Sequence, residues 1–244
     1  MKRVWWMRLL AVFPYTAFVF LPDMLIPAEA IPVSSCMMRQ IFGGRTVEGM
    51  TFFVMTMDRI GFLLLFNILY GNYIAQHFSV GNVYVFSRVV SRKRWWLGQL
   101  KELFQISLTY SILYTLLNVG IACRCSLLPL TWADGAVILF LAGFVLSLTF
   151  TSTVAINTLA TAYGTARAFL TVYAVMMAMV IFAITNQSAL LSLLNPMSCV
   201  GFFFETAVGK AAVVVCHIGW FLAGIIGSTR YMIHKDLLMP DHSL

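Results

Sequence analysis

The segment with the clearest chemical character combines apolar bulk, a run of positive charge and a pair of tryptophans. It covers residues 83–101 and reads VYVFSRVVSRKRWWLGQLK. A helix of this composition lies along a membrane surface, with its aromatic rings at headgroup level and its cations toward phosphate or a partner protein. Two interpretations follow. The segment is either a basic loop that contacts only lipid or a docking surface for another protein.

A second set of polar residues lies inside apolar runs. Ionisable and amide side chains are costly in lipid, so they mark a functional path or hydrogen bonds between helices. We predict a translocation path that includes Asp58, Arg59, Asn67, Asn72 and Asn157. Bonds between helices are the alternative role for the amides. The two charged residues would instead lie at the outer interface if their helix began near residue 60.

Four of the five cysteines lie in the connections that we expect outside the membrane. Cysteines in an oxidising compartment can form disulfides. The candidates for such a bond are Cys36, Cys123, Cys125 and Cys199. The alternative is that they are small apolar residues at the membrane edge. Cys216 lies within the last apolar run.

Nucleotide-binding and catalytic signatures are missing from the sequence. No Gly-x-x-x-x-Gly-Lys-Ser/Thr loop occurs, and Gly209-Lys210-Ala211 lacks both its spacing and its hydroxyl. The four histidines form no His-Glu-x-x-His motif, and no Gly-x-Ser-x-Gly is present. We therefore predict a protein that is not an enzyme and that holds no metal and no cofactor of its own.

The elements that carry these residues are transmembrane helices. The chain is 61% hydrophobic and 10% charged, with a mean hydropathy of +0.88, whereas soluble domains carry roughly 25% charged residues. A spanning helix needs about 20 apolar residues. Six such runs predict an all-α integral membrane protein with one transmembrane domain and spans at about 8–26, 52–74, 103–122, 134–159, 168–185 and 211–228.

The first run also resembles a secretory signal peptide, because it begins with Lys2-Arg3 and is followed by Ala28-Glu29-Ala30. Pro14, Pro22 and Asp23 make it a poor signal core, so we interpret it as a mature helix.

Charge in the connections predicts the orientation. Most of the 16 Lys and Arg residues fall on one side when both termini are placed in the cytoplasm. The net charge of +7 is then mostly cytoplasmic, which suits contact with anionic lipid and not with nucleic acid. The stretch 186–210 is too short and too broken to span, so we expect a re-entrant external segment before the sixth helix.

The basic segment and this layout resemble the type-2 permease subunits of ATP-binding-cassette exporters. That family typically has Ser-Arg-Pro-Val-Ser-Arg-Arg after the second span, then aliphatic residues and Gly-Lys. The matching positions are Ser87, Arg88, Ser91, Arg92, Lys93, Gly98 and Lys101. Val89 stands where the family often has Pro, and two residues separate Gly98 from Lys101. The family usually has a longer interfacial helix before span one than Met1–Met7 can form.

The resemblance implies a bacterial cell-membrane permease that works as a homodimer or beside a similar permease. A separate ATPase subunit would bind ATP and Mg and dock on a cytoplasmic coupling helix between spans two and three. The docking residues would be Phe86, Ser87, Arg88, Ser91, Arg92, Lys93, Arg94, Trp95 and Trp96. The apolar spans favour a hydrophobic or amphipathic cargo such as a peptide.

Two other hypotheses remain. The chain is a non-transporting accessory or sensory membrane subunit, in which case the basic segment docks a different partner. Alternatively it is a secondary transporter, which needs inverted repeats and broken helices around a midplane site. The sequence displays neither of these features.

Overall fold

The computed structural model describes residues 6–20, 25, 27–42, 50–77, 91–185, 194–197 and 207–234. These residues are helical apart from short connections, and no β-strand occurs among them beyond one isolated bridge that pairs Glu29 with Ser126. The elements are η1 (Arg8–Ala11), α2 (Val12–Val19), α4 (Val33–Phe42), α5 (Met50–Tyr70), α7 (Arg92–Cys125), α8 (Trp132–Tyr163), α9 (Thr165–Thr185) and α12 (Ala207–His234).

The boundaries of the two longest helices have local causes. Ser91 caps α7 by accepting a hydrogen bond from the backbone N–H of Arg94. Thr131 and Asp134 form a reciprocal capping box at the start of α8. Each cap satisfies backbone donors that a helix N-terminus leaves without partners. At the other end of α8, Gly164 has φ +81° and lets α9 begin at the next residue, because a left-handed backbone favours glycine.

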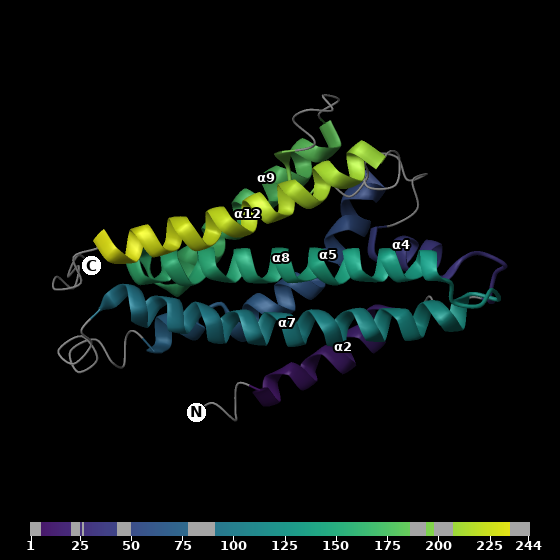
Figure 1. The fold of residues 1–244 in the computed structure, drawn as a ribbon, viewed down its shortest axis with the longest axis horizontal. Coiled ribbons are helices and arrows are strands. Elements are labelled where there is room, and N and C mark those ends of the chain that lie inside the picture. The colour runs from purple at the N-terminus through teal and green to yellow at the C-terminus, as the bar shows by residue number, and fades with distance from the viewer. Residues whose placement is uncertain are drawn as a thin grey trace.

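Helix α8 is the centre of the bundle and contacts α4, α5, α7, α9 and α12 (Figure 1). In this view α7 begins, α8 ends, α9 begins and α12 ends at the same end of the molecule. The opposite end holds α4 and the connection from α7 to α8. Successive long helices are therefore antiparallel, as a chain that repeatedly crosses one layer requires.

Aromatic side chains form much of the contact between α5 and α7. Phe62 stacks on Tyr114 with ring centroids 5.1 Å apart, and Phe66 contacts Tyr110 at 4.8 Å. The Tyr110 hydroxyl donates a hydrogen bond of 2.7 Å to the backbone carbonyl of Phe62. All four side chains are buried, so this layer combines large apolar burial with a satisfied polar group.

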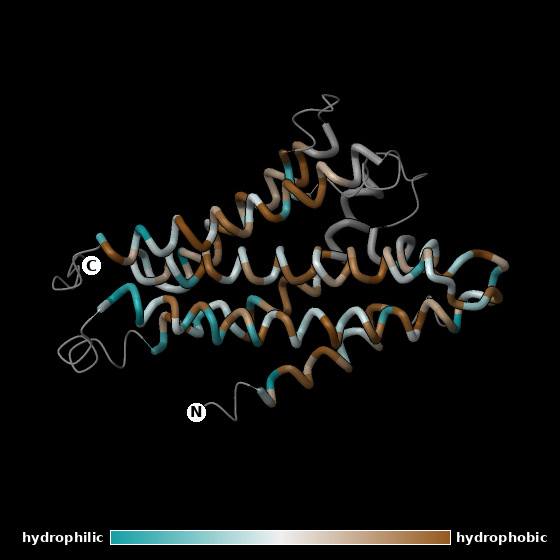
Figure 2. Tube along the Cα trace, viewed as in Figure 1, coloured by the Kyte–Doolittle hydropathy of each residue, from teal (hydrophilic) through white to brown (hydrophobic). Residues whose placement is uncertain are grey.

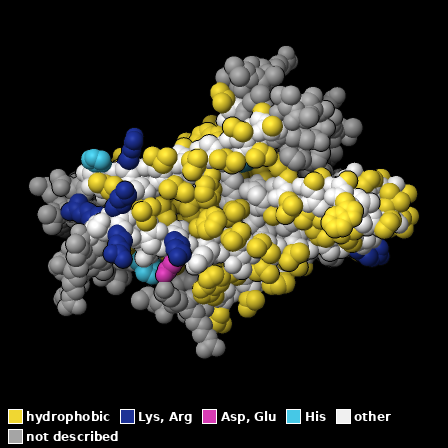
Figure 3. Space-filling model, in the orientation of Figure 1, with side chains coloured by type: hydrophobic (Ala, Val, Ile, Leu, Met, Phe, Trp, Pro, Cys, Tyr) yellow, Lys and Arg dark blue, Asp and Glu magenta, His cyan; other side chains and the backbone are white. Residues whose placement is uncertain are grey.

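Four helices within the described residues are long and apolar enough to cross a membrane. They are 92–125, 132–163, 165–182 and 211–234, and 8–19 is a shorter apolar helix. Apolar residues occur along the whole length of the long helices (Figure 2), and many of their side chains lie on the surface of the bundle (Figure 3). Leu139 is 75% exposed and Leu170 is 73% exposed. An outer surface of this kind is stable in lipid, where water is absent.

The last four predicted runs lie within α7, α8, α9 and α12, whereas 52–74 covers most of α5 and the turn after it, and helix is described over 8–19 of the run 8–26. The helices also differ in length from the runs. Helix α7 begins eleven residues before the predicted span at 103, and α12 continues six residues beyond 228. Hydropathy marks only the part of a helix that suits lipid, whereas hydrogen bonding continues the helix into the aqueous layer. Of the predicted re-entrant segment 186–210, the structure describes the short turn 194–197 and residues 207–210, which are the first residues of α12, and the rest lies outside the described residues.

Candidate functional site

The basic segment divides at Ser91. Phe86, Ser87 and Arg88 lie outside the described residues, whereas Arg92 to Lys101 form the first turns of α7. We expected a separate surface helix over 86–96. The residues from 92 onward instead continue without a break to Cys125, so they form one rigid unit with the third predicted span.

The two tryptophans of this segment have different environments. Trp96 has no exposed surface, and its Nε1 donates to the Ser228 hydroxyl of α12 at 3.4 Å. Trp96 therefore faces the interior of the bundle, whereas we expected its ring to contact the membrane interface. The helix direction places position 96 on the inward face together with Leu100 and Leu103, which are also buried. Trp95 is partly buried beside it.

Positive charge gathers where α7 begins and α12 ends (Figure 3). Lys93, Arg94 and Arg230 are exposed there. Among the described side chains, the Lys and Arg residues toward this end are Arg8, Arg92, Lys93, Arg94, Lys101, Arg167 and Arg230, and Arg124 lies at the other. The exposed cations form a surface suited to phosphate or to an acidic partner.

Helix α5 breaks close to this charged surface. It ends at Tyr70, and a further helical turn covers residues 73–77 after Gly71 and Asn72. The side chain of Asn157, on α8, lies in the break. Its Oδ1 accepts from the N–H of Ile74 at 2.7 Å and of Ala75 at 3.1 Å, and its Nδ2 donates to the Tyr70 carbonyl at 3.3 Å.

The Asn157 amide therefore lies within the series of backbone hydrogen bonds that would continue α5. An unbroken helix would join the Ile74 N–H directly to the Tyr70 carbonyl, and Asn157 bridges the same two groups instead. Side chains inserted in this way are an established cause of helix kinks. Arg8 satisfies a further carbonyl, that of Leu69, at 3.0 Å.

The turn after the break is bonded to α7. The Tyr73 hydroxyl donates to Glu102 Oε2 at 2.7 Å. Glu102 follows the basic residues on the same helix. A movement of the start of α7 would therefore act directly on the segment beyond the break in α5.

Asn67 holds a second polar cluster between α5, α8 and α9. Its Nδ2 donates to the Ser152 hydroxyl at 3.1 Å and to the Tyr173 hydroxyl at 3.0 Å. Its Oδ1 accepts from Thr153 at 2.6 Å and from Ser152 at 3.2 Å. Asn67 and Asn157 have no exposed surface. Both amides join helices in this structure, which is the alternative role considered for them, and their place in a translocation path stays a prediction.

The other predicted path residues have less definite surroundings. Asn72 lies at the break in α5, and its Oδ1 is buried with no hydrogen-bond partner among the described residues. Asp58 and Arg59 lie inside α5, which begins at Met50, well before residue 60. Their side chains fall outside the described set.

The end opposite the charged surface holds the predicted cysteines. Cys36 and Cys125 are buried and Cys123 is exposed. Cys199 lies outside the described residues, so the disulfide stays a prediction. At this end Asp134, in the first turn of α8, is bonded to the start of α4, because its Oδ1 accepts from the Ser34 N–H at 2.8 Å.

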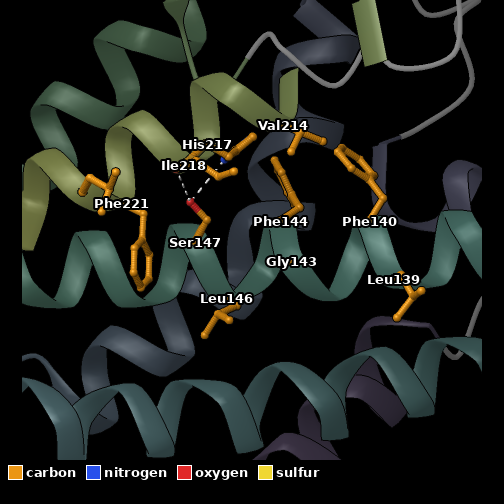
Figure 4. Close-up of a pocket in the computed structure, with 11 residues that line it drawn as sticks. Leu139, Phe140, Gly143, Phe144, Leu146, Ser147, Val214, His217, Ile218 and Phe221 are labelled. Atoms are coloured by element: carbon orange, nitrogen blue, oxygen red, sulfur yellow. Dashed lines mark hydrogen bonds between the residues drawn. The ribbon is translucent and has the colours of Figure 1, made fainter. Parts of the chain in front are cut away.

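A pocket that the sequence did not indicate lies between α8 and α12. It has a volume of about 370 Å³ and an almost entirely apolar lining, with Phe140, Phe144 and Val214 among its walls (Figure 4). Two polar side chains, Ser147 and His217, lie next to each other in its lining, with Ser147 Oγ 3.3 Å from His217 Nδ1. A histidine and a serine 70 residues apart carry no local signal, so only the crossing of the two helices could reveal this site.

A smaller pocket of about 260 Å³ lies on another side of α8, against α9 and the 194–197 turn. Thr151 and Trp220 line it, and the Trp220 indole donates to the Leu194 carbonyl at 3.1 Å. Small hydroxyl residues of α8 contribute to both pockets, and Ser147 is shared. Helix α8 therefore both packs against its neighbours and borders two cavities.

No cluster of three or more His, Cys, Asp or Glu side chains that could hold a metal ion occurs within the described ranges. No family model, no curated protein and no solved structure matches this chain.

Proposed function

We propose that this chain is the membrane-spanning permease subunit of an ATP-driven exporter in a bacterial cell membrane. It would have six spans, both termini in the cytoplasm and a re-entrant external segment. It would pair with a second copy or a similar permease, with the translocation path at their interface. Separate ATPase subunits would bind ATP and Mg. The cargo would be hydrophobic or amphipathic, such as a peptide.

The observation that carries the proposal is the hydrogen bond between Tyr73 and Glu102. It joins the basic start of α7, where a partner would dock, to the broken end of α5. An ATP-driven permease needs such a connection, because a partner can shift a two-state equilibrium only through contacts that differ between the states.

The continuity of α7 supports the same mechanism. An interfacial loop that only set the topology would need no rigid link to the bundle. Arg94 instead lies two residues from Trp96, whose indole is enclosed and bonded to α12. A force applied to the exposed cations would therefore tilt α7 as a unit against α12 and pull on Tyr73.

The docking assignment is tested by reversing charge at the start of α7. The double variant Arg92→Glu and Arg94→Glu is purified in mild detergent from the native host, and bound proteins are identified by mass spectrometry. Arg230→Glu is the matched control, because Arg230 is exposed at the same end but belongs to α12. We expect an ATP-binding-cassette ATPase to accompany the wild type and the control, but not the double variant.

Two outcomes would contradict this proposal in different ways. If the wild type carries no ATPase, the exporter function is wrong and the accessory or sensory hypothesis gains. If the double variant retains the ATPase, the docking surface lies elsewhere even though the exporter function stands.

The accessory hypothesis draws on one specific observation. Asn67 and Asn157 make bonds at both ends of their amides, so the polar groups expected to line a path join helices instead. A bundle held closed in this way suits a subunit that senses or anchors. The Tyr73→Phe variant separates the two hypotheses, because only an exporter would lose ATP-driven transport while keeping its ATPase bound.

A further inference from the structure

The pocket between α8 and α12 contains one polar atom whose hydrogen-bonding capacity is not used. His217 is 7% exposed, and its Nε2 is buried with no partner among the described residues. A buried polar atom left in this state costs free energy. Each such atom in a native structure calls for an explanation, and a missing ligand is one of them.

The hydrogen bonds on the other side of the ring define what this atom can accept. The Ser147 hydroxyl donates to the backbone carbonyl of His217 at 3.4 Å, and its oxygen lies 3.3 Å from His217 Nδ1. We assign the single Ser147 proton to this carbonyl, so that the hydroxyl oxygen accepts from an Nδ1–H. A neutral imidazole then leaves Nε2 as an acceptor, so the complementary group is an O–H or N–H donor.

The rest of the pocket selects an apolar molecule. Phe144 packs edge-on against the imidazole with centroids 5.2 Å apart, and Phe140, Val214 and Phe221 complete the walls. A volume of about 370 Å³ is in the range of small-molecule sites, which are mostly apolar with few polar groups. Figure 4 shows Phe144 and Ser147 rising from α8 toward His217 on α12.

The pocket opens sideways at mid-depth in the bundle. Its rim includes Leu139 and Ile218, which are 75% and 53% exposed, whereas Ser147 and His217 at its floor are buried. Ser147 lies 15 residues into the 32-residue helix α8, which is about 22 Å along an axis of about 48 Å. A ligand therefore enters from the hydrocarbon layer and not from water.

From these observations we propose that the pocket binds a membrane-dissolved, predominantly apolar alcohol whose hydroxyl donates to His217 Nε2. A charged or zwitterionic headgroup does not fit, because it would lie at mid-depth in an apolar cavity. The proposal concerns this pocket alone and holds whether or not the chain works with an ATPase.

The test uses the full chain in phosphatidylcholine nanodiscs and two photoreactive probes. One is a diazirine-bearing dodecanol, and the other is its methyl ether, which cannot donate a hydrogen bond. Labelled peptides are mapped by mass spectrometry, and dodecanol is the competitor. We expect the alcohol to label 139–147 and 214–222, with an apparent affinity on the order of tenfold above that of the ether.

Two variants assign the binding to this site. His217→Phe keeps an aromatic ring against Phe144 but removes Nε2, so the alcohol should lose its advantage over the ether. Gly143→Leu fills the pocket, because a Cβ at Gly143 meets no atom within 4 Å, and it should abolish labelling by both probes. Helical circular dichroism and gel filtration establish that each variant is folded.

Several results would overturn the proposal. These are absence of labelling in the wild type, labelling confined to other helices, equal labelling by alcohol and ether, or undiminished labelling in Gly143→Leu. Two results would support it and identify the source of the ligand. Displacement of the probe by neutral lipids extracted from the host membrane assigns the site to a resident lipid alcohol. Failure of those lipids to compete assigns it to a hydroxylated molecule from elsewhere.

Discussion

Replacing Asn157 with Ala tests whether the break in α5 depends on one side chain. The Asn157 amide satisfies three backbone groups of the broken segment, the N–H groups of Ile74 and Ala75 and the carbonyl of Tyr70. It has no exposed surface, so no bulk water replaces these bonds when the amide is removed. In the variant, either these backbone groups remain without hydrogen-bond partners, or α5 rearranges into one continuous helix across residues 71–72.

The two outcomes differ in magnitude. If the break persists, two buried backbone groups and the half-buried Ala75 N–H lose their partner, which costs up to about 3 kcal/mol at roughly 1 kcal/mol each. If α5 instead becomes continuous, the Ile74 N–H donates directly to the Tyr70 carbonyl. The loss then falls to about 1 kcal/mol, on the scale of about 0.6 kcal/mol for an interhelical bond in a membrane.

The assay is SDS titration in mixed micelles, followed by helical circular dichroism. Thr158→Val is the matched control, because the Thr158 hydroxyl donates only to Val154 within its own helix. A loss for Asn157→Ala no larger than that of the control would refute the role of Asn157 as the group that holds the break.

Three further predictions use the same assay. Gly71→Ala should destabilise the fold by about 1–3 kcal/mol, because a Cβ there would clash with the backbone oxygen of Asn67 and lie 2.6 Å from Phe169 Cε2. Gly98→Ala should stabilise it by about 0.5–1 kcal/mol, since open space surrounds that helical position, and equal effects of the two changes would contradict the packing at Gly71. Trp96→Ala should cost about 3–5 kcal/mol as the loss of a fully buried aromatic, and Trp95→Ala markedly less; the reverse order would place Trp96 at the surface. Asp134→Ala should cost about 2 kcal/mol, because the carboxylate completes the capping box of α8 by accepting from the Thr131 N–H and also accepts from the Ser34 N–H. A loss below roughly 0.5 kcal/mol, the scale of a neutral surface change, would show that this junction contributes little.

Part of the candidate site was predictable from the sequence. Asn67 and Asn157 were identified as costly polar groups in apolar runs, and the structure assigns them the joining role that was considered beside the path. Ser91, Arg92 and Arg94 were recognised as part of one basic segment. Trp96 was misplaced, because adjacent tryptophans at a helix start look equivalent until the neighbouring helix shows which one points inward. His217 was passed over for a related reason, since its partner Ser147 lies on another helix and matches no motif.

The sequence alone determined that lipid surrounds most of this chain and that its elements are helices. Apolar runs of about 20 residues are stable in lipid. Because lipid offers no hydrogen-bond partners, the backbone N–H and C=O groups there must bond to one another, so the composition of the chain dictated helices at these positions. Only the tertiary structure decided where the polar groups of those helices end up. Whether Asn157 faces lipid, a path or the ladder of α5 depends on how α8 rotates and how close α5 approaches. That is set by the summed packing of many side chains, and no short window of sequence contains it.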